Sequence, residues 1–217
     1  ASTLPPRPAD AYGAMVHDDE PDLYWRLGET AGTTAEDSSP TDNDGTYAGT
    51  ITRGQAGAVG ADPSVTLGAN ATIVAKKSVD NPTTFSQEIW FKTATNQGGR
   101  IFGFGRSGTP SFSSSYDRHL WMLNDGRVVF GTYNGQENRV TSPASLNDNQ
   151  WHHVVSQIGP GGMRLYVDGQ LVATNPNTQS ENYPGYWRLG GDNAWGGNTS
   201  AYFNGQVDEA AIYSRIL

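Results

Sequence analysis

Residues 150–173 read QWHHVVSQIGPGGMRLYVDGQLVA, and this stretch decides the fold. It contains strand-like runs at 151–158, 163–167 and 170–173, separated by the GPGG turn and by Asp168-Gly169. Glycine-rich and Asp-Gly turns between alternating apolar and polar residues are typical of β-hairpins. The stretch therefore predicts three consecutive antiparallel strands.

The pentapeptide YWRLG occurs twice, at 24–28 and at 186–190. Strand alternation places one set of side chains toward a core, namely Trp25, Leu27, Trp187 and Leu189. The same alternation points the other set outward, namely Tyr24, Arg26, Tyr186 and Arg188. Because the flanking residues do not match, the recurrence indicates two similar strands and not a duplicated module.

Further alternating runs lie at 84–93, 100–105, 119–123, 127–133 and 201–213. We expect the second run to be the hairpin partner of the first, and an Asp-Gly turn to join the third to the fourth. About a dozen short strands with close turns predict an all-β fold, a two-sheet antiparallel β-sandwich of the jelly-roll type.

Composition excludes several function classes. The 217 residues carry a net charge of -8, and the 14 basic residues are scattered, so we expect no nucleic-acid partner. Cysteine is absent, and no apolar run approaches the ~20 residues of a membrane span. We therefore expect no disulfides and no membrane insertion.

The N-terminal residues 1–11 are proline-rich and are interpreted as a linker. Residues 12–217 are predicted to form a single domain. We interpret the chain as one module of a longer, exported protein, and we expect other domains of that parent chain among its partners.

Three stretches resemble the laminin-G-like, concanavalin A-like jelly-roll modules of bacterial secreted and cell-surface proteins. They are the run 150–173, the C-terminal FNGQVDEAAIYSRIL (203–217) and the N-terminal DLYWRLGETAGTTAEDSSPTDNDGTY (22–47). The resemblance runs from about Tyr12 to Leu217 and is loose over 54–82. It implies two curved antiparallel sheets, often with bound calcium, in a carbohydrate-binding or adhesion module. The superfamily includes lectins, glycosidases and spacers, so the resemblance does not identify a ligand.

The histidines do not form a metal-binding pattern. His152 and His153 are neighbours on a strand and point to opposite faces, so they cannot chelate one ion together. His17 and His119 are isolated in the sequence. We expect packing or hydrogen-bonding roles for all four.

An enzyme of the glycosidase type needs two carboxylates across a sugar ring. The retaining glucanases of the resembled fold carry an E-x-D-x-x-E-like pattern on one strand, whereas QEIWFK (87–92) has one acid. Asp208 and Glu209 are adjacent, so alternation predicts opposite faces for them. We expect no catalysis. A glycoside hydrolase or polysaccharide lyase with acids from distant strands is the open alternative.

Calcium is the cofactor that we expect, in a structural role. Ca²⁺ binds six to eight oxygens from flexible loops, and the resemblance implies that the aspartate of the C-terminal DE pair shares an ion with the N-terminal region. The candidate ligands are Asp208, Asp37, Asp44 and Glu29. The alternative is that the N-terminal acids are ordinary turn formers.

A glycan site needs exposed aromatic rings beside hydroxyl-binding groups. Two polar stretches, 115–118 with 133–136 and 183–186 with 191–198, offer both. The candidate ligand-binding residues are Trp195, Tyr186, Asp192, Asn193, Tyr116, Asp117, Arg118 and Tyr133. Trp195 could instead anchor its own loop, and Tyr116, Asp117 and Arg118 could form a hydrogen-bond network.

The sequence therefore predicts a non-catalytic, lectin-like carbohydrate-binding module, stabilised by calcium, in a secreted or cell-surface bacterial protein. Its expected partner is a polysaccharide or another glycan. The first alternative is an adhesion or spacer domain that binds protein or no ligand. The second alternative is a glycan-cleaving enzyme.

Overall fold

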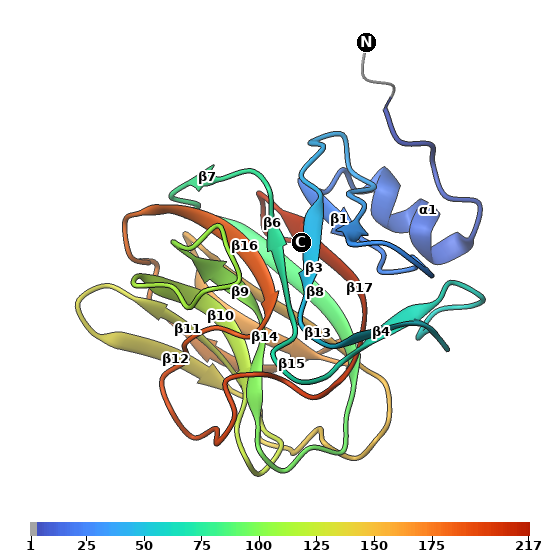
Figure 1. Cartoon of the computed structure of the whole chain (residues 1–217). Coiled ribbons are helices and arrows are strands. Elements are labelled where there is room, and N and C mark those ends of the chain that lie inside the picture. The colour runs from blue at the N-terminus through green and yellow to red at the C-terminus, as the bar shows by residue number, and fades with distance from the viewer. Residues whose placement is uncertain (1–3) are drawn as a thin grey trace.

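The computed structural model describes residues 4–217 (Figure 1). Strands dominate this range, with one short helix near the N-terminus. The elements in chain order are α1 (Ala11–Asp18), β1 (Leu23–Trp25), β2 (Thr34–Ala35), β3 (Gly45–Ala48), β4 (Ile51–Gln55), β5 (Ser64–Leu67), β6 (Thr72–Ala75), β7 (Val79–Asp80), β8 (Phe85–Lys92), β9 (Gly99–Gly105), β10 (Tyr116–Met122), β11 (Val128–Tyr133), β12 (Glu137–Thr141), β13 (His152–Gly159), β14 (Gly162–Val167), β15 (Gln170–Asn175), β16 (Pro184–Gly190) and β17 (Gly205–Tyr213).

The strands form two antiparallel sheets that pack face to face (Figure 1). Sheet A has the order β15-β14-β13-β8-β17-β5-β4, with β1 paired to β17. Sheet B has the order β12-β11-β10-β9-β16-β6-β3-β2, with β7 paired to β16. The predicted all-β sandwich of the jelly-roll type is confirmed.

Aromatic side chains join the two sheets. Trp187 of sheet B packs against Phe85 of sheet A, with ring centroids 5.2 Å apart, and lies 5.0 Å from Phe104 of its own sheet. Trp25 stacks on Phe102 across the core at 6.3 Å. The inward residues predicted from the two YWRLG copies are therefore confirmed as core residues.

The predicted hairpins over 119–133 and 151–173 are confirmed as β10–β11 and as the β13–β14–β15 meander. The predicted hairpin between 84–93 and 100–105 is wrong. β8 pairs with β13 and β17 in sheet A, whereas β9 pairs with β10 and β16 in sheet B. The connection between them crosses from one sheet to the other, a change that alternation alone does not reveal.

The helix α1 covers part of the outer face of sheet A (Figure 1). Its Val16 packs against Tyr24, which was predicted to point outward and is fully buried by this contact. Asp10 caps the helix, accepting a hydrogen bond from the Gly13 amide at 2.9 Å, and forms an ion pair with Arg26.

Residues 1–3 of the predicted linker lie outside the described residues, and the domain boundary near residue 12 stays a prediction. Between residues 4 and 217 no helix has the length and apolarity that crossing a membrane requires.

We predict that Trp187→Ala lowers the free energy of unfolding by about 3–5 kcal/mol, because it removes the ring that touches both sheets. Urea unfolding of the purified variant measures this change. Phe112→Ala is the control, since that ring is 42% exposed and its loss should cost about 0.5 kcal/mol or less. Equal effects of the two substitutions would contradict the assigned core.

Candidate functional site

Two adjoining hollows lie beside the end of β11 in sheet B. The smaller, here called the Trp195 hollow, has a volume of about 190 Å³ and is lined by Ser114, Ser115, Tyr116, Tyr133, Glu181 and Trp195. The larger, here called the Gln179 hollow, has a volume of about 430 Å³ and is lined by Thr83, Tyr133, Asn134, Gly135, Thr178, Gln179, Ser180, Glu181 and Asn182. Tyr133 and Glu181 line both. Together the hollows fall within the ~300–1,000 Å³ typical of small-molecule sites.

Trp195 is half-buried, and its ring is supported from below. Gly131 of β11 lies beneath the ring, and a Cβ atom at that position would collide with it. The rings of His119 and Trp121 meet the indole edge-on, with centroids 4.6 and 5.7 Å away. Arg139 Nη2 donates a hydrogen bond of 3.0 Å to the Trp195 carbonyl. The indole is therefore both the anchor of its loop and a wall of the hollow.

His119 forms the floor under this ring. It is fully buried, and burial lowers its pKa well below the usual value, so the imidazole is neutral at pH 7. Neither of its ring nitrogens has a hydrogen-bond partner within residues 4–217. His119 therefore acts mainly as an aromatic support for Trp195.

Asp117 and Arg118 are buried and position the hollow without lining it. Asp117 Oδ2 accepts hydrogen bonds from the amides of Tyr133 (3.1 Å) and Glu181 (3.0 Å), and Oδ1 accepts from Arg118 Nη1 (2.6 Å). Arg118 Nη2 donates to the Glu181 carbonyl at 2.6 Å. Arg118 has a positive φ of 52° within an irregular β9–β10 register. These contacts fix the main chain of Tyr133 and Glu181, the two residues that line both hollows.

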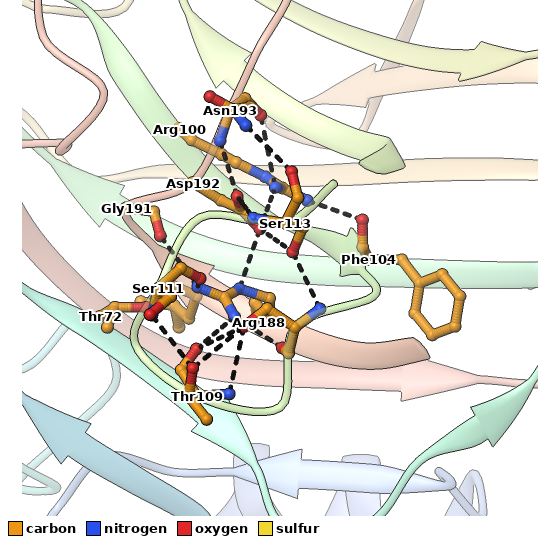
Figure 2. Close-up of polar contacts among 12 residues, drawn as sticks. Thr72, Arg100, Phe104, Thr109, Ser111, Ser113, Arg188, Gly191, Asp192 and Asn193 are labelled. Carbon is orange, nitrogen blue, oxygen red and sulfur yellow. Dashed lines mark hydrogen bonds and ion pairs between the residues drawn. The ribbon is translucent and has the colours of Figure 1, made fainter. Parts of the chain in front are cut away.

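Asp192 is the centre of a second buried network on the same sheet face (Figure 2). Its carboxylate lies 2.9 Å from Arg100 Nη1 and 3.0 Å from Arg188 Nε. It also accepts hydrogen bonds from the amide and the hydroxyl of Ser113, each at 2.7 Å. Burial acts to raise its pKa, but the two guanidinium groups hold the pKa of Asp192 below the usual value.

Arg188, predicted to point outward, is fully buried because a loop covers it. Its Nη1 donates to the carbonyls of Ser107 and Thr109, each at 2.6 Å, and its Nη2 donates to that of Ser111 at 3.1 Å (Figure 2). Asp192 and Arg188 together hold the 106–115 loop on the outer face of sheet B. This loop supplies Ser114 and Ser115 to the Trp195 hollow.

The structure brings together part of the predicted glycan site. Trp195, Tyr116 and Tyr133 surround one hollow, although they come from different stretches of sequence. Asp117, Arg118 and Asp192 are buried supports. Asn193 donates from Nδ2 to the Ser113 carbonyl, and Tyr186 lies against Gly108, so neither lines the two hollows.

Glu181 lines both hollows and was missed by the sequence analysis. It lies in the connection from β15 to β16, a polar stretch without an aromatic residue until Tyr183. The backbone path from sheet A to sheet B brings this stretch beside Tyr133. Periodicity carries no signal for such a placement, because the connection is not a strand.

The histidines have separate partners. His152 lies 2.8 Å from carboxylate oxygens of both Asp148 and Asp168. His153 Nε2 lies 2.8 Å from Glu88. The two neighbouring imidazoles thus contact different acids.

A carboxylate cluster lies on the other side of the sandwich. Asp62, Asp208 and Glu209 each offer an oxygen within 4.8 Å of the others. The prediction that alternation separates Asp208 from Glu209 is wrong. A bulge in β17 with a φ of 53° at Glu209 sends both side chains to the outer face of sheet A.

Burial raises the pKa of Asp208 and that of Glu209 to about 8. Glu209 accepts hydrogen bonds from the Tyr24 hydroxyl and, at 2.9 Å, from Arg26 Nη2. Asp208 Oδ2 accepts from the Ala58 amide at 2.9 Å, whereas its buried Oδ1 has no partner within residues 4–217.

This donor set fits a hard cation. Three carboxylates, with two buried oxygens (Asp62 Oδ2 and Asp208 Oδ1) that lack a hydrogen-bond partner within residues 4–217, provide the ligand type that Ca²⁺ prefers. Gly28 and Gly57 leave space beside the cluster, since a Cβ atom at Gly28 would lie 2.9 Å from Asp62 Oδ1 and one at Gly57 would lie 3.0 Å from Asp208 Oδ2.

The other predicted metal ligands are not part of this cluster. Asp37 accepts four hydrogen bonds, from the Tyr24, Ser39 and Asn43 amides and the Ser39 hydroxyl, so its oxygens already have partners. Asp44 accepts from the Asp37 amide and forms an ion pair with Lys76. Glu29 accepts from the Tyr47 hydroxyl at 2.7 Å. Asp62, which does belong to the cluster, lies in the region where the sequence resemblance is loose.

The family assignment follows from a match over most of the described sandwich. A family model described as the concanavalin A-like lectin/glucanases superfamily matches residues 60–217. The chain belongs to this superfamily. No curated protein matches the sequence.

Solved structures show the same fold at low sequence identity. Domain 4 of an extracellular arabinanase from Geobacillus stearothermophilus, in complex with arabinotriose, is 17% identical with a TM-score of 0.65, over 89% of this chain and 92% of that one. A sialidase CBM40 of Ruminococcus gnavus, bound to α2,3-sialyllactose, is 19% identical with a TM-score of 0.51, over 63% and 78%. The binding domain of botulinum neurotoxin serotype C1 is 13% identical with a TM-score of 0.61, over 92% and 50%. The superfamily fold is thus shared with carbohydrate-binding domains.

We predict that Asp192→Ala lowers the free energy of unfolding of the protein by about 3–5 kcal/mol, because it leaves Arg100 and Arg188 buried without a counter-charge. Urea unfolding provides the measurement. The control is Asp125→Ala, which removes an exposed ion pair with Arg127 and should change stability by about 1 kcal/mol or less. A loss no larger than the control's would contradict the central place of Asp192.

Proposed function

We propose that the chain is a non-catalytic carbohydrate-binding module that holds a glycan in the hollows around Trp195. The observation that carries this proposal is the arrangement of Trp195, Tyr116 and Tyr133 around one hollow beside serine hydroxyls and the Glu181 carboxylate. Tyr133 is 37% exposed, and the other two rings are half-buried. Rings of this kind stack on the C–H faces of sugars, while neighbouring oxygens bind hydroxyl groups.

The surface is preformed, which favours binding by a small ligand. The Trp195 ring rests on Gly131 and His119, and Asp117 fixes the main chain at Tyr133 and Glu181. A ligand therefore orders few side chains when it binds. Because the proposed contacts are a few stacked rings and hydrogen bonds to hydroxyl groups, we expect short sugars to bind weakly and several modules on one parent chain to raise the avidity.

Two observations support a binding role without catalysis. Among the lining residues of the two hollows, Glu181 is the carboxylate, and glycoside hydrolysis needs a pair across the sugar ring. Asp208 and Glu209 are fully buried, so a sugar cannot reach them while the 56–62 segment is in place.

The proposal includes the cellular setting. We place the module in a secreted or cell-surface bacterial protein, with other domains on the same parent chain. The similarity to a domain of an extracellular arabinanase and to a sialidase CBM40 supports this setting.

We predict that Trp195→Ala weakens glycan binding at least about tenfold, because a central aromatic contact is lost. A glycan array and pull-downs with insoluble polysaccharides identify a ligand, and titration calorimetry measures its affinity. Phe112→Ala is the matched control, since this exposed ring packs on Tyr202 and is not among the lining residues of either hollow, so its loss should leave binding unchanged.

Two results would count against this proposal. One is a folded wild-type protein that binds no glycan, which would favour an adhesion or spacer domain. The other is an affinity that Trp195→Ala leaves intact, which would place the binding surface elsewhere.

We further propose that Asp208, Glu209 and Asp62 bind a structural calcium ion. The buried oxygens Asp208 Oδ1 and Asp62 Oδ2, which have no hydrogen-bond partner within residues 4–217, and the close approach of the three carboxylates support this site. A bound divalent cation would keep the buried carboxylates ionised and would connect β17 to the 56–62 segment. The chain's own contribution is the bulge that aligns the two neighbouring acids.

We predict that calcium at 100 times its Kd stabilises the protein by about 2.7 kcal/mol, which corresponds to on the order of 5–10 °C in Tm. In calcium-free protein the raised pKa values of Asp208 and Glu209 make stability fall as pH rises from about 4 to 8. Protons therefore compete with calcium, and the calcium-induced gain in Tm should be larger at pH 8 than at pH 6.

Asp208→Asn should abolish the calcium response, whereas Asp37→Asn, outside the cluster, should retain it. Thermal unfolding with calcium and with a chelator provides both measurements. A response lost in Asp37→Asn and kept in Asp208→Asn would move the ion to the N-terminal loops.

A further inference from the structure

We infer that the two hollows select uncharged oligosaccharide chains over anionic ones, and that Glu181 is the residue that sets this specificity. The inference rests on the proposed glycan-binding function and names the class of glycan. Its basis is the charge distribution around the hollows and the position of Glu181 between them.

Glu181 lies where a glycan in either hollow would meet it, because it lines both. Its main chain is locked on two sides, since its amide donates to Asp117 at 3.0 Å and its carbonyl accepts from Arg118 at 2.6 Å. Its side chain is half-buried, and burial raises its pKa. Sugar hydroxyls that donate hydrogen bonds to this carboxylate would replace the water that it has lost.

Of the nearby cations, Arg106 is exposed and, like Arg118, lowers the pKa of Glu181 against the effect of burial, but it does not line either hollow. Arg118 is fully buried and forms an ion pair with Asp117 at 2.6 Å. Arg139 pairs with Glu137 and stands beside the Trp195 ring, with its guanidinium 5.9 Å from the ring centroid. Neither arginine is among the lining residues of the two hollows.

The remaining lining side chains are suited to neutral hydroxyl groups. Apart from the Trp195 ring and Gly135, they carry hydroxyls and amides, for example Asn134, Thr178 and Gln179 in the larger hollow. A carboxylated sugar would place its negative charge beside Glu181, and the lining residues of the two hollows include no cation to pair with it. Like charges at such short range disfavour binding.

The shared residues also predict a dependence on chain length. Tyr133 and Glu181 form a common border of the two hollows, so a sugar in the Trp195 hollow can continue into the Gln179 hollow. A trisaccharide should therefore bind more tightly than the corresponding monosaccharide, because it occupies both.

The test compares neutral and anionic trisaccharides by titration calorimetry at low ionic strength. The neutral probes are arabinotriose, xylotriose, cellotriose and galactotriose, and the anionic probes are trigalacturonic acid and α2,3-sialyllactose. Wild-type protein should bind at least one neutral probe about tenfold or more tightly than either anionic probe. Sodium chloride at 0.5 M should reduce this ratio, since salt screens partly exposed charges.

Glu181→Gln should reduce the ratio of the affinity for the neutral probe to that for the anionic probes to about threefold or less. The substitution removes the repelling charge and keeps a side-chain acceptor. Glu36→Gln is the matched control. This exposed acid follows β2, at the opposite end of sheet B from β12, and its loss should leave the ratio unchanged. Unchanged Tm values establish that both variants are folded.

The outcomes separate the two proposals. Anionic probes that bind as tightly as neutral ones, with binding that Trp195→Ala abolishes, would overturn the inference and keep the carbohydrate-binding function. A ratio that Glu181→Gln leaves at the wild-type value would overturn the role of Glu181. Binding of no probe, together with a negative glycan array, would overturn both proposals.

Discussion

The carboxylate of Asp192 is the contact on which the arrangement of the loops over the outer face of sheet B depends. It is fully buried between Arg100 and Arg188, and Arg188 in turn binds three carbonyls of the covering loop. Burying ionic groups costs several kcal/mol unless every partner is in place. Loss of one of these contacts would leave the other charges buried without compensation, so the network holds the loops over sheet B in the arrangement that shapes the Trp195 hollow.

A second layer of side chains on sheet B explains why outward-facing residues are buried. Glycines in β9 and β11 leave the space for this layer, because a Cβ atom at Gly103 would press on His119 and one at Gly131 would collide with Trp195. The sheet is thus covered on both faces over part of its area. Strand alternation still predicts the direction in which each side chain points. On this sheet, however, side chains that point away from the core are covered by loops and are not exposed to water.

The sequence predicts the sandwich well, because strands and hairpin turns are encoded by neighbouring residues, namely short alternating runs and Asp-Gly pairs. It predicts the sites only in part. The positive φ values at Arg118 and Glu209 mark irregular pairings that redirect neighbouring side chains, and no residue type at either position signals them. Glu181 and Asp62 reach their sites through connections whose paths depend on the whole topology. Trp195 was found because a large aromatic residue in a polar loop has few local partners.

The Trp195 hollow lies on the outer face of sheet B and the carboxylate cluster on the outer face of sheet A, with the aromatic core between them. Tyr133 of sheet B borders both hollows, whereas the Asp208 cluster belongs to β17 of sheet A and the 56–62 segment. An ion in that cluster cannot touch a glycan in the hollows. It can influence binding only through the fraction of protein that is folded, since apparent affinity scales with the population of the competent state. Metal dependence of binding at temperatures far below Tm would therefore indicate a different ion site, close to the sugar itself.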